Sequence, residues 1–161
     1  MQFDLATNLY QLLSFFPSFG YLERSLLTFF RPTGKSVFGI HDPVGLRYLF
    51  QLRLGLSNLH SHKMRHGFTD IQSDLCLSCK HGAEDSYHFL LKCTSYDIQR
   101  ATLMNSVNAI LLTNNLNYPA NFPLNELNLF LYGHPSVSHS ENKLILMSTI
   151  KFIRDSGRFS T

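Results

Sequence analysis

The sequence has no tryptophan, and charged residues make up only 16% of its 161 residues. It has no apolar run of the roughly 18 to 20 residues that a membrane-spanning helix needs, and no N-x-[ST] glycosylation acceptor. Its first residues lack the basic stretch that opens a secretory signal. We therefore expect an intracellular protein, cytoplasmic or nuclear, that is not secreted and binds no membrane.

Motifs of the common catalytic sites are also missing. The aspartates show no paired spacing that would hold two Mg²⁺ ions for phosphoryl transfer. The chain has neither a glycine-rich phosphate loop nor a serine in the context of a nucleophile elbow. We expect no enzymatic activity and no small-molecule substrate.

Apolar residues nevertheless make up 44% of the chain, with 14 Phe and 7 Tyr, so the sequence has enough hydrophobic material to fold around a core. Its length fits one domain. The 14 Lys and Arg residues against 11 Asp and Glu give a formal charge of +3, which permits an anionic partner without requiring one.

Apolar residues recur at helical spacing along most of the chain, and this predicts a mainly α fold. The predicted helices cover residues 4–16, 21–30, 43–56, 98–113, 124–132 and 138–157, and a further short helix is weakly indicated at 60–67. The helix that begins at Pro43 is so densely apolar that we expect it at the centre of the core.

Two of these helices carry more specific signals. Ser138 and Glu141 form an S-x-x-E capping box at the start of the last helix, and Gly157 is placed to end it. The helix at 98–113 is expected to bury one apolar face. That face consists of Ile98, Leu103, Val107, Ile110 and Leu111.

All three cysteines lie between positions 76 and 93, and an odd, clustered set makes a poor disulfide framework. The stretch CLSCKHGAEDSYHFLLKC has the pattern C-x2-C-x8-H-x4-C, which supplies the four N/S ligands that tetrahedral Zn²⁺ prefers. We predict a Zn²⁺ site at Cys76, Cys79, His88 and Cys93. A site closed by four protein ligands leaves no open position for water, so its expected role is to fold the chain.

The spacing of the last two ligands raises a geometric question. His88 and Cys93 are five residues apart, about 140° around a straight helix, so the helix must tighten or end near Lys92. Asp85 or Ser86 can cap the helix that presents His88.

Two alternatives to this ligand set stay open at this point. His81 is a competing fourth ligand, but it lies only two residues after Cys79 and would strain the loop. The cluster would also be compatible with three buried thiols and a lone histidine without metal.

The segment between residues 43 and 69 is basic and contains no Asp or Glu. Its cations are candidates for neutralising phosphates, and Tyr48, Phe68 or Tyr87 could stack on a base. The alternative is the solvated face of an ordinary helix. The four candidate nucleic-acid contacts are Arg47, Arg53, Lys63 and Arg65.

The same segment holds a pair of histidines, His62 and His66, at a spacing of i, i+4. They would share one helix face and could form a second metal site. This hypothesis is weak because neither a carboxylate nor a cysteine stands beside them.

These features divide the sequence into four parts. Residues 1–42 hold N-terminal helices and a linker, 43–75 the buried helix and the basic segment, 76–93 the zinc-binding knuckle, and 94–161 the C-terminal helices. The predicted fold is a small, mainly α domain with one Cys-Cys-His-Cys zinc knuckle.

The sequence resembles the C-terminal tail of non-LTR (LINE-type) retrotransposon reverse transcriptases in three stretches. They are VFGIHDPVGLRYLFQLRLGLSNLHSHKMRHGF at 37–68, the cysteine cluster at 76–93, and LFLYGHPSVSHSENKLILMSTIKFIRDSGRF at 129–159. The resemblance covers about positions 20 to 159. In that family the segment follows the polymerase domain and carries a zinc knuckle thought to bind the element's RNA or target DNA.

The resemblance implies that the four predicted ligands bind zinc and that Arg53, Lys63 and Arg65 contact nucleic acid. The family's Tyr/Phe-x-Asp-Asp polymerase motif and its endonuclease domain are missing from this sequence. The expected function is therefore a non-catalytic zinc-binding module that binds nucleic acid, either RNA or target DNA with RNA favoured, as a fragment of a reverse transcriptase that lacks the polymerase active site. The alternative is a zinc-ordered docking module that packs on a polymerase domain or another protein without touching nucleic acid.

Overall fold

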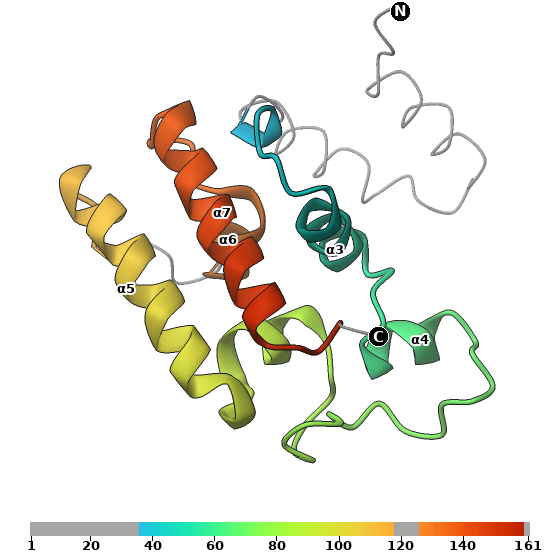
Figure 1. Ribbon diagram of the computed structural model, residues 1–161. Coiled ribbons are helices and arrows are strands. Elements are labelled where there is room, and N and C mark those ends of the chain that lie inside the picture. The colour runs from blue at the N-terminus through green and yellow to red at the C-terminus, as the bar shows by residue number, and fades with distance from the viewer. Residues whose placement is uncertain (1–35, 118–125, 160–161) are drawn as a thin grey trace, which may run out of the picture. The chain divides into compact units, whose positions relative to one another are not determined.

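Helix α7 (His139–Asp155) is the central element of the structure, a computed structural model that describes residues 36–117 and 126–159 (Figure 1). These residues belong to one compact unit, 32–161. Helix α7 packs against α3 (Pro43–Leu54), α5 (Asp97–Thr113) and α6 (Glu126–Tyr132). Its buried residues are Asn142, Ile145, Leu146, Thr149, Ile150, Phe152 and Ile153.

The described elements confirm the prediction of a mainly α fold. Besides α3, α5, α6 and α7, they comprise the short helix α4 (His60–Arg65), the π-helical turn η1 (His88–Lys92) and the 3-10 turn η2 (Thr94–Tyr96). The part of the chain that the structure describes contains no strand, only an isolated antiparallel bridge between Leu75 and Ala83. The helices predicted at 4–16 and 21–30 lie outside the described residues.

The capping box predicted for the last helix is confirmed. The Ser138 hydroxyl accepts a hydrogen bond from the Glu141 N–H, and the Glu141 carboxylate accepts one from the Ser138 N–H. This reciprocal pair satisfies two of the N–H groups that a helix start leaves without partners. At the other end, Gly157 follows the C-cap residue with a left-handed φ of +64°.

Helix α3 does not lie at the centre of the core, which corrects the expectation for residues 43–56. Its buried residues are Gly45, Leu49 and Leu52, on the side that faces α6 and α7. Val44 and Leu54 are exposed, as is Leu56 just beyond the helix end. The apolar density of this segment therefore exceeds what its neighbours cover, and α7, which packs against three helices, takes the central place.

The buried face of α5 also differs from the expectation in two residues, because Ile110 is half-buried and Ile98 is exposed. Leu103, Val107 and Leu111 are buried at i, i+4 spacing, whereas Ile98 is 83% exposed. Five residues separate Ile98 from Leu103, which turns the two side chains about 140° apart on an α-helix. Ile98 consequently faces away from α7.

An aromatic cluster joins the cysteine segment to α7. The ring of Phe89, on η1, has its centroid 5.3 Å from each of the rings of Tyr96, Phe152 and Phe159. Such edge-to-face contacts add to the free energy gained from burying the rings. Residues far apart in the sequence are thereby packed into one core.

Within residues 36–117 and 126–159, no helix combines the length and the apolar character needed to cross a membrane.

Candidate metal centre

The side chains of Cys76, Cys79, His88 and Cys93 converge, with their four ligand atoms all within 4.8 Å of one another. The Sγ atoms of Cys76 and Cys93 are 3.7 Å apart, and Cys79 Sγ lies 3.2 Å from Nε2 of His88. Two thiolates that each lie about 2.3 Å from a tetrahedral Zn²⁺ are about 3.8 Å apart. The cluster therefore has the dimensions to hold a metal ion.

The first two ligands sit on a tight turn closed by backbone hydrogen bonds. The Cys76 N–H donates to the Gly82 carbonyl at 3.0 Å, and the Lys80 N–H donates to the Cys76 carbonyl at 3.0 Å. Both Lys80 and Gly82 have left-handed φ values, +60° and +67°. Glycine adopts this conformation freely, whereas a lysine does so rarely, and the chain reversal brings Cys79 back toward Cys76.

Hydrogen bonds and burial shift the pKa values of Cys79 and Cys93 in opposite directions. Burial works to raise the pKa of Cys79, but the His81 N–H and the hydrogen bonds from the neighbouring cysteines outweigh it and lower that pKa. Burial raises the pKa of Cys93 to about 12. A buried thiol of this kind loses its proton only when a cation takes the proton's place, so metal binding here must release protons.

The π-helical turn η1 resolves the five-residue spacing between His88 and Cys93. The Cys93 N–H donates to the His88 carbonyl at 2.7 Å, an i to i+5 bond that brings both residues onto one side. The helix ends at Lys92, as expected, but it widens before that residue instead of tightening. The Asp85 carboxylate accepts from the His88 N–H at 2.7 Å and caps the helix as predicted.

His88, and not His81, is the histidine of the cluster. The His81 ring nitrogen Nδ1 lies 2.5 Å from the Cys79 carbonyl oxygen, and the side chain is exposed. The His88 ring instead lies against the turn, where a Cβ added at Gly82 would be 3.4 Å from its Nδ1. The expectation that His81 is too close to Cys79 to complete the site agrees with this placement.

Three residues that support the cluster were not found from the sequence. Arg100 donates to the carbonyls of Leu90 and Cys93, at 2.9 and 2.6 Å, and so satisfies the end of the π turn. Glu84 lies 3.8 Å from the Cys76 thiol and binds Arg158 through both carboxylate oxygens. One feature of the sequence could have indicated Glu84, because it is the lone glutamate between Cys76 and Cys93.

Of the four candidate nucleic-acid contacts, Arg53 is half-buried between α3 and α6. Its Nε donates to the Leu131 carbonyl at 2.7 Å, and its guanidinium lies over the rings of Phe50 and Tyr132. Burial lowers its pKa to about 10. This position joins Arg53 to α6 through the Leu131 carbonyl, and its contact with nucleic acid stays a prediction.

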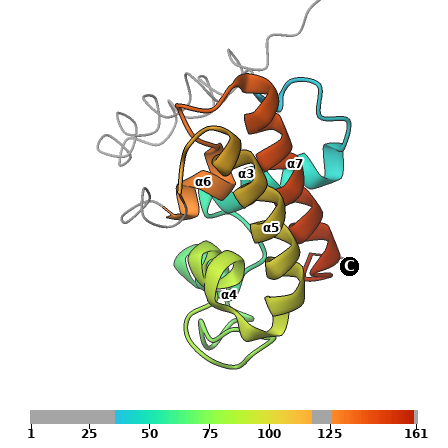
Figure 2. The ribbon, with the colours of Figure 1, turned by 90° about the vertical axis from the view of Figure 1, so that its left-hand side faces the viewer.

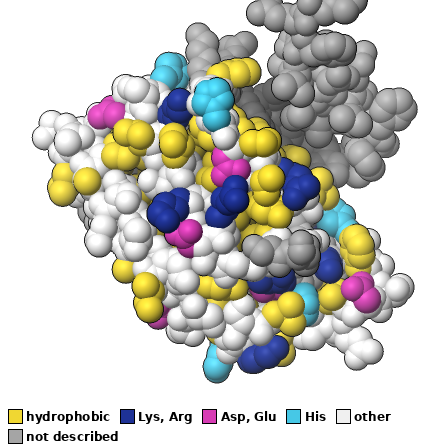
Figure 3. All heavy atoms as spheres, viewed as in Figure 1, with side chains coloured by type: hydrophobic (Ala, Val, Ile, Leu, Met, Phe, Trp, Pro, Cys, Tyr) yellow, Lys and Arg dark blue, Asp and Glu magenta, His cyan; other side chains and the backbone are white. Residues whose placement is uncertain are grey.

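The other three candidates lie on the surface but are not gathered in one place. Arg47 is exposed on α3, where it contacts the Tyr48 ring. Lys63 and Arg65 are on α4, and Lys63 is 4.0 Å from the Asp70 carboxylate. In Figure 3 the dark blue side chains are scattered over the visible face, with acidic side chains between several of them.

The three residues predicted to stack on a base differ in how far they are exposed. The Tyr48 ring stacks on the buried ring of Phe159, and the Tyr48 hydroxyl donates to the Phe159 carbonyl at 2.9 Å. These contacts are made within the fold. Phe68 and Tyr87 are exposed, and each has a lysine near its ring, Lys63 and Lys92 respectively.

The pair His62 and His66 does not form a second metal site. His62 is buried between the hydroxyls of Ser57 and Ser86, and His66 bonds the Gly55 carbonyl. Across the described residues, the cysteine cluster is the one group that places three or more potential ligands together.

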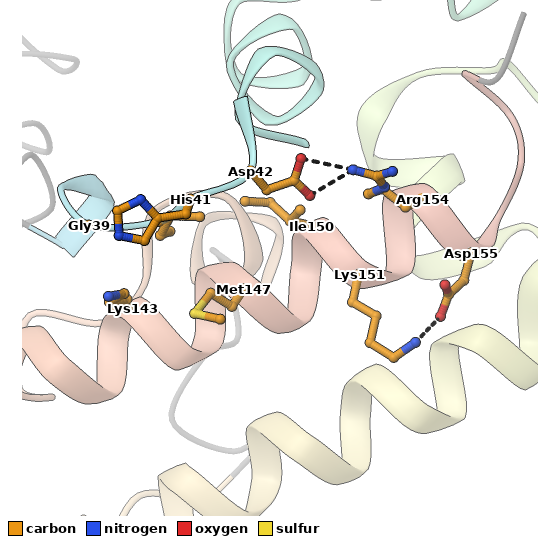
Figure 4. A pocket seen from close by; sticks show the side chains of 10 residues that line it. Gly39, His41, Asp42, Lys143, Met147, Ile150, Lys151, Arg154 and Asp155 are labelled. Atoms are coloured by element: carbon orange, nitrogen blue, oxygen red, sulfur yellow. Dashed lines mark hydrogen bonds and ion pairs between the residues drawn. The ribbon is translucent and has the colours of Figure 1, made fainter. Parts of the chain in front are cut away.

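A cavity of about 540 Å³ lies between residues 39–42 and the outer side of α7 (Figure 4). Asp42 bonds Arg154 through both oxygens, and Lys151 bonds Asp155 at 2.6 Å. Both carboxylates in its wall are therefore paired with cations.

Comparison with protein-family models, with curated proteins and with solved structures finds no match to this chain. Any functional assignment must come from its own side chains. Of the sites described above, the cysteine cluster has the most specific chemistry, because its donor atoms and their distances suit a metal ion.

Proposed function

We propose that the protein is a non-catalytic, zinc-binding module that binds nucleic acid, with RNA rather than DNA as the expected partner. The observation that carries the proposal is the convergence of Cys76, Cys79, His88 and Cys93. Three thiolates and one imidazole favour Zn²⁺ over the hard cations, which prefer oxygen ligands. Four protein donors would close the site, so the ion's role is structural.

The position of the cluster supports a structural role for zinc. Its ligands come from a turn and from η1, and η1 reaches the core through Phe89. A structural zinc site contributes on the order of 10 kcal/mol of apparent binding free energy, which is comparable to the stability of a small domain. Binding of the ion would therefore order the knuckle and the aromatic cluster together.

The support for nucleic-acid binding lies beside the knuckle. The backbone N–H groups of His60 and Ser61 at the start of α4 donate to Glu84, so α4 is fixed to the cysteine segment. This helix presents Lys63 and the exposed Arg65. A site with three thiolates around Zn²⁺ carries a charge of about −1, so attraction to phosphates must come from such local cations.

An origin from a retrotransposon reverse transcriptase is part of the proposal. It rests on the three sequence stretches that resemble that family.

The experiment has two stages. Elemental analysis of the purified protein should find one zinc per chain, and circular dichroism should show loss of helix after chelation. Binding of a fluorescently labelled single-stranded RNA is then measured by anisotropy over a series of salt concentrations. Replacing Lys63 and Arg65 by Ala should weaken binding and reduce the salt slope by about two units.

The matched control for that variant is the replacement of Lys143 and Lys151 by Ala on α7, which removes the same charge away from the knuckle. An unchanged salt slope in the α4 variant would place the contact elsewhere. Absence of any salt-dependent RNA binding would reject the nucleic-acid part of the proposal.

The second candidate function is a zinc-ordered docking module that binds a protein, such as a polymerase domain. The observation that favours it is the exposure of large apolar side chains. They are Met147 in the wall of the cavity of Figure 4, and Val44, Leu54 and Leu56 on and just after α3. Exposed apolar patches mark protein interaction sites. Zinc-dependent folding without RNA binding would support this function over the first.

A further inference from the structure

The outer face of α5 carries a row of exposed side chains that have no neighbour in the described fold. Helix α5 lies at the edge of the described helices in Figure 1 and in front in Figure 2, and α7 is the one long helix packed against it. The row spans about 100° of the helix. Its members are Ile98, Ala101, Thr102, Asn105, Ala109 and Leu112.

This face is unusual because it has no charge. The sequence contains no Lys, Arg, Asp, Glu or His between Arg100 and Glu126, whereas the solvent side of a surface helix normally carries charged residues. Ile98 and Leu112, at the two ends of the row, are 83% and 64% exposed. A charged partner such as nucleic acid would find no complementary group here.

The hydroxyls on this side of α5 are already satisfied by the helix itself. Thr102 donates to the Ile98 carbonyl at 3.3 Å, and Ser106 donates to the Thr102 carbonyl at 3.0 Å. Such back-bonded hydroxyls lose little when water is removed from them. Burying these hydroxyls in an interface would therefore cost little desolvation free energy.

We propose that this face binds the same face of a second copy of the chain, with the two α5 helices antiparallel and Asn105 on the two-fold axis. Apart from Thr102, whose counterpart Asn108 is half-buried, the pattern is complementary to itself around Asn105. Ile98 would meet Leu112 of the second copy, and Ala101 would meet Ala109 of the second copy. Small residues between the large ends allow two helices to approach closely. A two-fold dimer requires this self-complementarity, and a different partner does not.

Asn105 is the specificity element of the proposed interface. Ile98, Asn105 and Leu112 follow one another at intervals of seven residues, the repeat of paired helices. A carboxamide has both donors and acceptors, so two copies of Asn105 can bond each other across the axis. A single asparagine in an otherwise apolar seam is a known device for fixing the register of two helices.

The size of the face indicates a weak dimer. Helix α5 has 17 residues, a length of about 25 Å, so one helix pair buries less than the roughly 1,200 Å² of a stable standard interface. We therefore expect a dissociation constant of about 10 to 500 μM. The interface contains neither a ligand of the candidate metal centre nor a candidate nucleic-acid contact, so it is tested on the zinc-loaded protein without nucleic acid.

Sedimentation velocity on the full chain, from a few micromolar upward, measures the proposed equilibrium. We expect a monomer–dimer equilibrium in the wild type and at least about a tenfold higher dissociation constant in L112E. The matched control is L144E, which places the same charge at a similarly exposed leucine on α7. The control should dimerise like the wild type.

Photo-crosslinking tests whether the α5 face lies at the two-fold axis of the dimer. A benzophenone amino acid incorporated in place of Thr102, at the edge of the face, should give a covalent dimer, and the same group in place of Leu144 should not. The proposal is overturned if the wild type is monomeric up to about 1 mM, or if L112E dimerises as strongly as L144E. If the same benzophenone at position 102 crosslinks only to other proteins in a cell lysate, the face belongs to a different partner and the proposal is equally overturned.

Discussion

Glu84 and Arg158 form a two-pronged ion pair that ties the metal centre to the C-terminal end of the described fold. The Nε and Nη2 atoms of Arg158 donate to the two carboxylate oxygens of Glu84, each at 2.8 Å. The carboxylate also accepts from the His60 N–H and lies 3.8 Å from the Cys76 thiol. The pair thus connects the knuckle, α4 and the residues after α7.

The first prediction concerns this pair, whose side chains are 1% and 13% exposed. R158M should lower the free energy of unfolding by about 3 to 5 kcal/mol, because it leaves the buried Glu84 carboxylate without its cation. Urea unfolding of the zinc-loaded protein measures the change. The control is R154M, which breaks the more exposed pair with Asp42 and should cost at most about 1 kcal/mol. Equal losses in the two variants would contradict the importance assigned to the buried pair.

The second prediction distinguishes the ligands from their neighbours. C76S and H88A should each lose zinc and helical signal together, because the ion and the fold depend on each other. H81A should retain one zinc per chain, since His81 lies outside the cluster. Metal content and circular dichroism are measured on the same samples. Loss of zinc from H81A, or full helicity in metal-free C76S, would contradict the proposed structural zinc site.

The sequence predicted those parts of the structure that depend on local patterns. The described helices follow from periodic apolar residues and from the capping box at Ser138, and the cluster that could hold a metal ion follows from the cysteine spacing. The widened turn at His88 was not predicted, because an i to i+5 bond has no periodic signature in five residues.

The burial of several side chains depends on neighbours that are distant in the sequence. Arg53 and Arg47 look alike in the sequence, and only the arrival of α6 beside α3 decides that one is buried. Ile98 was assigned to the apolar face of its helix, but α7 covers the side marked by Leu103. The pair of Glu84 and Arg158 joins residues 74 positions apart, so no local pattern could predict it.

The third prediction tests the role of Arg53. R53M should lower the free energy of unfolding by about 1 to 3 kcal/mol, because the buried Leu131 carbonyl loses its donor. The salt slope of RNA binding should not change. R47M is the control for an exposed arginine on the same helix and should change stability by less than about 0.5 kcal/mol. A reduced salt slope in R53M, with unchanged stability, would return Arg53 to the set of nucleic-acid contacts.

The fourth prediction is a dependence of stability on pH that comes from His62. Ser86 donates its hydroxyl to the Leu52 carbonyl, so it accepts from His62 Nε2, and Ser57 then donates to His62 Nδ1 at 2.7 Å. This network requires a neutral ring. Burial is the main cause that lowers the pKa of His62 below its ordinary 6.5, and the nearby Arg65 lowers it further.

Because the pKa of His62 is lower in the folded state, the unfolded chain binds the extra proton more readily. The stability that the neutral ring contributes is complete above pH 6.5, and it is lost as the pH falls through the folded pKa, by up to about 1.4 kcal/mol per pH unit. H62Q should be less stable at pH 8 but should show a flatter decline below pH 6.5 than the wild type. Urea unfolding of both proteins across pH 5 to 8 gives the comparison, with H41Q as a control at an exposed histidine. Parallel pH profiles for the wild type and H62Q would show that His62 does not titrate on unfolding.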